Sequence, residues 1–136
     1  MELKDRIAEY RDDICDTLSE VIKIPSVAGE PRPGMPYGEE PAKALKYMLD
    51  AAQKMGFRVK NCGNRAGHAE YGEGDEYAAV LVHLDVVPAG GGWVYPPFGG
   101  VIEAGKIYGR GACDNKGPAV AALYCLKALK DTKIRG

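Results

Sequence analysis

Apolar side chains in residues 2–23 recur at steps of three and four, which is the spacing of one face of an α-helix. The pattern predicts an amphipathic helix that ends before Pro25, because proline disfavours helical backbone in the residue ahead of it. The same spacing predicts a second helix over 39–55, with Gly56 as its C-terminal stop, and a third over 117–130.

The apolar residues between the second and third helices follow strand patterns instead. Residues 57–60 alternate as a half-buried strand, and a short strand is expected over 67–71. Residues 77–84 form a continuous apolar run of strand length, which predicts a central strand covered on both faces. Residues 101–103 and 106–108 predict a hairpin.

The order of these elements indicates an α/β layer that begins a larger sheet. A chain of 136 residues corresponds to about one domain. Residues 25–38 are rich in proline and glycine and predict a long loop. The polar residues 131–136 resemble the lead-in to another strand, so we expect this chain to be a portion of a longer domain.

The composition of the chain limits the kinds of molecule that it is expected to bind. Hydrophobic residues make up 46% and charged residues 27%, the balance of a soluble globular protein. With a net charge of −1 and no basic block, nucleic acid is not an expected partner. No apolar run reaches the ~20 residues that span a membrane, and the charged N-terminus is not that of a signal peptide. The four cysteines are expected to be reduced thiols, and the protein to be cytoplasmic.

His83 and Asp85 form the first candidate site motif. His83 follows Val80-Leu81-Val82, so it is expected at the carboxyl end of a strand, the edge where ligands collect in open α/β sheets. Asp85 would share a face with it and could accept its second N–H, which fixes the tautomer of a metal-binding imidazole. The alternative is a hydrogen-bonded histidine at a strand end, with Asp85 capping a turn. The motif alone favours neither.

Asp114 lies in the second motif, a glycine-rich turn that precedes the third predicted helix. Its carboxylate has two oxygens that could bridge two cations. The alternative is that Asp114 is only the N-cap of the helix, and the motif taken alone favours that simpler role.

The motifs in their order resemble the M20 family of zinc peptidases and deacylases, which includes dipeptidases, carboxypeptidases, aminoacylases and desuccinylases. The motif that begins at His83 and the motif that begins at Asp114 are most similar to its PepV-like (Xaa-His, carnosinase-type) dipeptidase branch. The matching residues are His83-Leu84-Asp85-Val86-Val87-Pro88, Trp93, Pro97-Phe98, Gly105-Lys106-Ile107-Tyr108-Gly109-Arg110-Gly111 and Asp114-Asn115-Lys116-Gly117-Pro118. The resemblance extends over essentially the whole chain. It implies a partial three-layer, zinc-peptidase-like α/β domain, with helices packed on a mixed β-sheet.

The resemblance also implies roles for individual residues. His83 would bind one zinc ion, Asp114 would bridge two, and Asp85 would serve catalysis by orienting His83. Cobalt or manganese would suit the same ligands. A cis peptide bond is expected after Asp114. The two ions would activate a water that cleaves the amide bond of a small peptide or an N-acyl amino acid.

The remaining catalytic residues of the family, a glutamate pair, another acidic ligand and a final histidine, follow later in its sequences. After Asp114 this chain has one acidic residue, Asp131, and no histidine. The resemblance therefore implies that residues 1–136 are the amino-terminal part of the catalytic domain, without its remainder and without the lid or dimerisation domain, and that this part alone is inactive. Two alternatives stay open: a non-catalytic binding module of the same fold, and a half-site completed by a partner chain. A homo-oligomer is compatible with the enzyme interpretation and with both alternatives.

Overall fold

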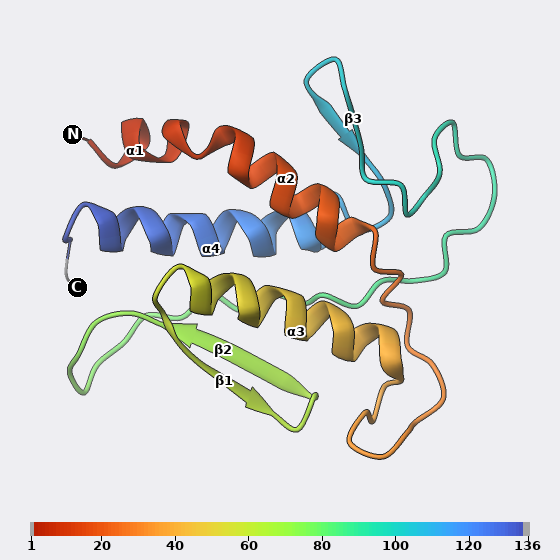
Figure 1. The fold of residues 1–136 in the computed structure, drawn as a ribbon, viewed down its shortest axis with the longest axis horizontal. Helices are drawn as coiled ribbons and strands as arrows, with labels where there is room; N and C mark the ends of the chain where they lie inside the picture. Colours follow the sequence, from red (N-terminus) through yellow and green to blue (C-terminus); the bar gives the residue numbers. More distant parts are fainter. Residues whose placement is uncertain (1, 135–136) are drawn as a thin grey trace.

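The computed structural model describes residues 2–134, which form helices and short strands (Figure 1). In chain order these are α1 (Leu3–Glu9), α2 (Arg11–Ile22), α3 (Glu39–Lys54), β1 (Arg58–Cys62), β2 (Ala66–Glu70), β3 (Val101–Glu103), β4 (Lys106–Tyr108) and α4 (Lys116–Asp131). The helices predicted over 39–55 and 117–130 are confirmed, as are the strands near 57–60 and 67–71 and the hairpin.

Tyr10 divides the first predicted helix in two. At φ −90° and ψ 8° it leaves the helical region, so the single helix expected over 2–23 is wrong at this position. Its buried ring lies 5.9 Å from the ring of Tyr124, and its hydroxyl donates to the carboxylate of Asp131. The break brings this side chain onto α4, a tertiary contact that the helical spacing alone does not reveal.

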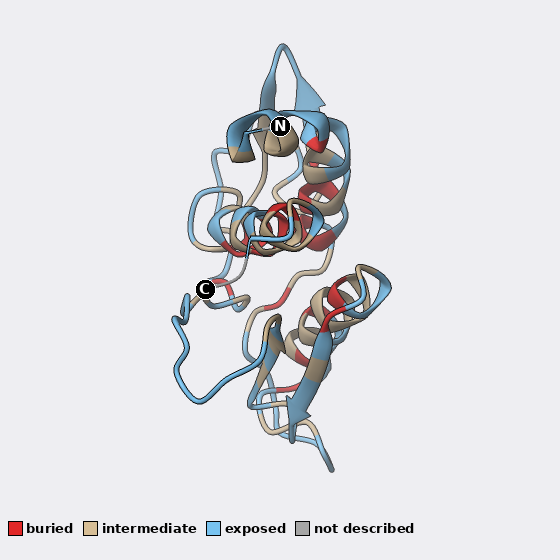
Figure 2. Ribbon diagram, turned by 90° about the vertical axis from the view of Figure 1, so that its left-hand side faces the viewer, coloured by how far each residue is buried: buried red, intermediate tan, exposed pale blue. Residues whose placement is uncertain are grey.

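The main core lies where α1 and α2 pack on α4, while α3 covers the β1–β2 hairpin. Figure 2 shows the buried positions gathered along the facing sides of the helices. The first cluster comprises Tyr10, Leu18, Val21, Ile22, Val120, Tyr124 and Ala128. A second cluster of Ala52, Phe57 and Leu123 joins α3 to α4. Helix amphipathicity accounts for the members of both clusters that lie in helices, whereas Tyr10 and Phe57 lie outside them.

The strands of residues 2–134 lie in two separate antiparallel hairpins. In the first, Val59 pairs with Ala69, and in the second, Ile102 pairs with Ile107. The α/β class is therefore confirmed as helices combined with small antiparallel sheets, whereas the mixed sheet would need further strands beside these hairpins.

Residues 77–84 do not form the expected buried strand, and that prediction is wrong for this structure. Tyr77 is 90% exposed, Val80 75% and Leu81 97%. An apolar run favours a strand only where neighbouring backbone supplies hydrogen-bond partners, and no segment of residues 2–134 pairs with this run. It therefore remains extended and open to solvent.

Residues 131–134 do not form the lead-in to a strand that the sequence predicts over 131–136. The amides of Lys133 and Ile134 donate back to the carbonyls of Lys130 and Leu129, so the chain closes α4 with a turn, and residues 135–136 lie outside the described part. Between residues 2 and 134, no helix has the length and apolar character needed to cross a membrane.

Gly117 provides a test of the packing that joins the turn of Asp114 to α4. A Cβ at this position would lie 2.1 Å from the backbone oxygen of Ala112. Gly117→Ala is therefore expected to lower the free energy of unfolding by about 1–3 kcal/mol, despite the better helix propensity of alanine. Gly91→Ala is the control, since nothing lies within 4 Å of its added Cβ. Urea unfolding measures both, and equal stabilities would contradict the packing described.

Candidate metal centre

The imidazole of His83 lies between two carboxylates. Its Nε2 atom is 3.0 Å from Oδ1 of Asp114, and its Nδ1 atom is 3.3 Å from Oδ1 of Asp85. The backbone amide of His83 also donates to Oδ1 of Asn115 at 3.2 Å. The structure therefore brings together the three residues singled out from the sequence, although His83 and Asp114 are 31 positions apart.

The contact with Asp85 gives the Nδ1 proton of His83 an acceptor. Nδ1 lies 3.1 Å from the backbone carbonyl oxygen of Asp85, which can only accept a hydrogen bond. Nδ1 is therefore a donor. Nε2 faces the carboxylate of Asp114, which also only accepts, so without a metal both ring nitrogens can carry protons. Loss of the Nε2 proton would leave the tautomer that presents Nε2 as a metal ligand, with Nδ1 held by an acceptor.

Asp114 does not cap the helix that follows it. The N-cap of α4 is Asn115, and no side-chain hydrogen bond caps the helix. The side chain of Asp114 is 84% exposed and contacts His83 instead, so its carboxylate is open on the side away from the ring. The peptide bond between Asp114 and Asn115 is cis, as the family resemblance implies.

Ser26 and Lys116 support this cluster, and the sequence reasoning assigned no role to either of them. The hydroxyl of Ser26 donates to the carbonyl of Leu84 at 2.6 Å, next to Asp85. Lys116 is completely buried, and burial lowers its pKa to about 8, so it is still protonated at neutral pH. Lys116 belongs to the last family motif, but nothing in the local sequence indicates these contacts, because both residues bond to carbonyl groups from distant parts of the chain.

The geometry of His83 and Asp114 suits a shared cation. Two ligands of one tetrahedral zinc ion, each at about 2.0–2.2 Å, lie roughly 3.3 Å apart. The 3.0 Å between Nε2 and Oδ1 is therefore within a few tenths of an ångström of that spacing. Within residues 2–134, however, no group of three or more histidine, cysteine or acidic side chains could hold a metal ion. The pair could supply at most two ligands, with Asp85 as the carboxylate that would orient His83.

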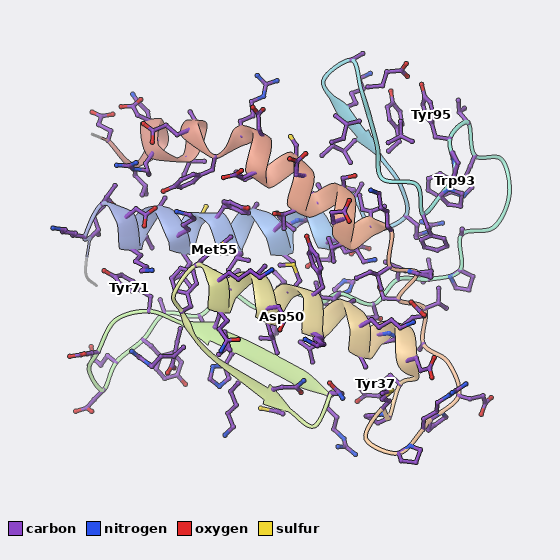
Figure 3. The ribbon with its side chains drawn as sticks, in the orientation of Figure 1. Tyr37, Asp50, Met55, Tyr71, Trp93 and Tyr95 are labelled. Carbon is purple, nitrogen blue, oxygen red and sulfur yellow. The ribbon has the colours of Figure 1, made fainter. Side chains whose placement is uncertain are left out.

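A loop rich in aromatic residues lies beside the turn of Asp114. The guanidinium of Arg110 lies over the ring of Trp93, 5.2 Å from its centroid, and both side chains donate to the carbonyl of Ala89. Figure 3 shows Trp93 and Tyr95 together on this loop, near β3. The loop residues of the family motifs are thus fixed to the backbone turn that leads to Asp114.

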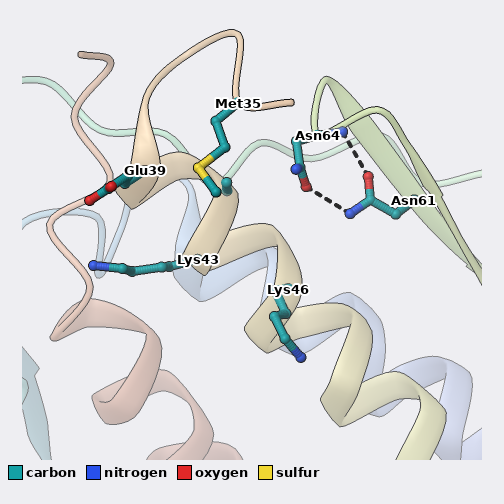
Figure 4. A pocket seen from close by; sticks show the side chains of 7 residues that line it. Met35, Glu39, Lys43, Lys46, Asn61 and Asn64 are labelled. Atoms are coloured by element: carbon teal, nitrogen blue, oxygen red, sulfur yellow. Dashed lines mark hydrogen bonds between the residues drawn. The ribbon is translucent and has the colours of Figure 1, made fainter. Parts of the chain in front are cut away.

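A surface hollow of about 460 Å³ lies elsewhere, against α3 (Figure 4). Its walls come from α3, from Met35 and from the β1–β2 hairpin, where the side-chain amides of Asn61 in β1 and Asn64 in the turn bond to each other. None of its lining residues belongs to the cluster around His83, so the hollow is not part of the candidate metal centre.

Comparisons with known proteins agree with the motifs. Residues 79–136, which include His83, Asp85 and Asp114, match Peptidase family M20/M25/M40. The chain is 43% identical over 130 residues to "Putative dipeptidase YtjP" of Bacillus subtilis (strain 168), covering 94% of this chain and 28% of that protein. It is 41% identical over 133 residues to "Putative dipeptidase SH1171" of Staphylococcus haemolyticus (strain JCSC1435), covering 96% and 28%. The chain thus spans 28% of the length of these relatives.

The fold is similar to that of a solved dipeptidase. The crystal structure of human carnosine dipeptidase 1 matches with a TM-score of 0.76 and 29% sequence identity, over 97% of this chain and 32% of that one. The resemblance of this chain to M20 dipeptidases is therefore confirmed in both sequence and fold.

The contacts of His83 predict how it titrates. Burial by itself lowers the pKa of His83, but the hydrogen bonds to the Asp85 carbonyl and to Asp114, with the charges of both carboxylates, together raise it above 6.5. Protonation of His83 should therefore stabilise the fold fully below the unfolded value near 6.5, and this contribution should be lost as pH rises through the folded pKa.

A ¹H NMR titration measures this value, with His68 on β2 as the reference imidazole. Asp114→Asn is expected to lower the pKa of His83, because it removes the facing charge. A His83 pKa that does not respond to this substitution would contradict the contact described.

Proposed function

We propose that this chain is the amino-terminal part of the catalytic domain of a zinc-dependent dipeptidase, with the rest of that domain and the lid or dimerisation domain supplied by further sequence. In this proposal Nε2 of His83 would be a ligand of one zinc ion, the carboxylate of Asp114 would be shared between two, and Asp85 would orient His83. Cobalt or manganese is an alternative to zinc, since imidazole and carboxylate ligands accept all three.

One observation carries the proposal: His83 has its two ring nitrogens directed to different carboxylates. Nδ1 lies 3.3 Å from Oδ1 of Asp85, and Nε2 lies 3.0 Å from Oδ1 of Asp114. A histidine needed only as a strand-end hydrogen-bond donor would not require a second, largely exposed carboxylate at its other nitrogen. Exposed pairs of this kind contribute little to stability, so a metal site is the better explanation of the arrangement.

The chain's own residues contribute orientation and charge to the reaction. A zinc pair would supply a water activated at neutral pH and would polarise the scissile carbonyl. Asp85 keeps the proton of His83 on Nδ1, so that Nε2 is free of it when the site is loaded. Asp114 contributes a negative charge and two oxygens on the open side of the cluster. Metal binding should therefore compete with the proton on Nε2 and weaken at low pH.

The isolated chain is proposed to be inactive. Two ligands do not complete the coordination of one zinc ion, which takes three protein ligands and a water in catalytic sites. No further cluster of metal-binding side chains lies in residues 2–134, and the family's general-base glutamate would have to come from outside this chain. The proposed substrate is a dipeptide, of which Xaa-His peptides are the first to test, because the matching structure is that of a carnosine dipeptidase.

A chimera tests the function directly. Residues 1–136 replace the matching part of the Bacillus subtilis relative, and hydrolysis of dipeptides is measured with zinc against the unmodified relative. We expect the chimera to hydrolyse the dipeptides that the relative hydrolyses, and His83→Ala or Asp114→Ala to reduce kcat/KM by at least about 10³-fold, since each removes a metal ligand. His68→Ala is the matched control and should leave the activity unchanged.

The alternatives give different results in the same assay. A folded chimera without activity, beside an active relative, would favour a non-catalytic binding module. A fully active Asp114→Ala chimera would contradict the assignment of Asp114 as a ligand. Robust dipeptide hydrolysis by the purified 136-residue chain alone would contradict the proposed dependence on further sequence.

A further inference from the structure

Two buried polar side chains, Ser26 and Lys116, meet the same short stretch of backbone. Both residues are 0% exposed. Residues 21–26, which we call the support turn, comprise the last residues of α2 and the turn that follows it. Ser26 belongs to the support turn, and Lys116 reaches it from the first turn of α4. The support turn therefore receives contacts from both halves of the candidate metal centre.

Ser26 fixes the segment of His83 and Asp85. Its hydroxyl donates to the carbonyl of Leu84 at 2.6 Å, and its own carbonyl accepts from the amide of Val86 at 3.0 Å. These two backbone groups flank Asp85, so the arrangement reproduces a bridge between parallel strands, with a hydroxyl in place of a backbone N–H. The backbone around Asp85 is thereby held against the support turn, and with it the neighbouring His83.

Lys116 fixes the turn of Asp114. Its Nζ donates to the carbonyl of Val21 at 2.9 Å and to that of Ile24 at 2.6 Å. Each carbonyl also accepts one backbone N–H, from Ile24 and from Ser26 respectively. Carbonyl oxygens at the C-terminal end of a helix carry partial negative charge, which suits an ammonium group. Because Asp114 lies just ahead of Lys116 in the chain, the position of its backbone follows from this anchor.

Gly111 joins the two anchored segments. Its carbonyl accepts from the amide of Lys116 at 2.9 Å. A Cβ added to Gly111 would lie 2.9 Å from Cγ1 of Val86 and 3.0 Å from Cδ of Lys116. The segment of His83 and the turn of Asp114 are thus in direct contact, and a shift of either would be transmitted to the other.

Stability alone does not account for a buried ammonium at this position. Removing a charged group from water costs several kcal/mol, and well-packed apolar side chains often replace buried charges without loss of stability. A methionine would fill much of the same space as Lys116. What it could not supply is a pair of directed hydrogen bonds to the support turn.

We propose that the support turn is the common base of the metal pair, and that Ser26 and Lys116 are positioning residues. Ser26 positions the imidazole of His83, and Lys116 positions the carboxylate of Asp114. This inference rests on the proposed function, because it concerns the ligands of that site, but its structural part can be measured without metal.

Ser19 and Lys130 provide matched controls. The hydroxyl of Ser19 also donates to a backbone carbonyl at 2.6 Å, that of Gly100. Lys130 donates to the carbonyl of Met55, at the end of α3. Each control removes the same kind of hydrogen bond as its counterpart, outside the segments of His83 and Asp114. The variants to compare are Ser26→Ala with Ser19→Ala, and Lys116→Met with Lys130→Met.

The first measurement is metal-free hydrogen exchange in the 136-residue chain. We expect the amide of Val86 to exchange at least about tenfold faster in Ser26→Ala than in Ser19→Ala. We expect the same increase at the amide of residue 116 in Lys116→Met, compared with Lys130→Met. Both comparisons are made under conditions of equal global stability. The second is the dissociation constant for Zn²⁺, by competition with a chromophoric chelator. Both variants should bind about 10–100-fold more weakly than their controls, the usual effect of residues that orient ligands.

The two measurements separate the two claims. If neither the wild-type chain nor the chimera takes up Zn²⁺ at His83 and Asp114, the proposed metal ligation fails, and hydrogen exchange alone decides the positioning. If exchange at Val86 and at residue 116 matches the controls, positioning is overturned whatever the metal affinity. Ser26→Cys fills a similar space with a weaker donor and should fall between wild type and Ser26→Ala, so the test still holds if the alanine variant does not fold.

Discussion

A buried ammonium group requires hydrogen-bond acceptors, and Lys116 finds them in the carbonyls at the end of α2. This constraint sets the place of α4 against α2, because Lys116 begins α4 while its partners belong to the residues that end α2. The turn of Asp114 precedes α4 and takes its position from the same contact. The main core between α1, α2 and α4 lies along the same helices, beyond the contact of Lys116 with the end of α2.

Much of the fold follows from local patterns in the sequence. The helical spacing predicts the cores of α3 and α4, and strand patterning predicts the hairpins, because each of these elements makes its backbone hydrogen bonds with itself or with its neighbour in the chain. The run 77–84 could not be predicted in the same way. Its apolar side chains favour a strand, but its backbone has no partner strand in residues 2–134, so it remains exposed.

The sequence predicts His83, Asp85 and Asp114 as site residues, but the reason for placing them together differs from the contacts that hold them in the structure. The sequence placed His83 and Asp85 at the edge of a sheet, where ligands commonly collect. In the structure His83 and Asp114 meet without such a sheet, through Ser26, Lys116 and the close contact at Gly111. Single-sequence patterns do not reveal these supports, because a hydroxyl or an ammonium that bonds to a distant carbonyl leaves no periodic signal.

The central claim is that Nε2 of His83 and the carboxylate of Asp114 are ligands of the same metal ion. Its most direct test is ¹⁵N NMR of the histidine side chains during a Zn²⁺ titration of the chain. The account predicts that Zn²⁺ shifts the Nε2 resonance of His83, that Nδ1 of His83 stays protonated, and that Asp114→Ala abolishes the shift. Coordination through Nδ1, or a response confined to His68, would contradict the account.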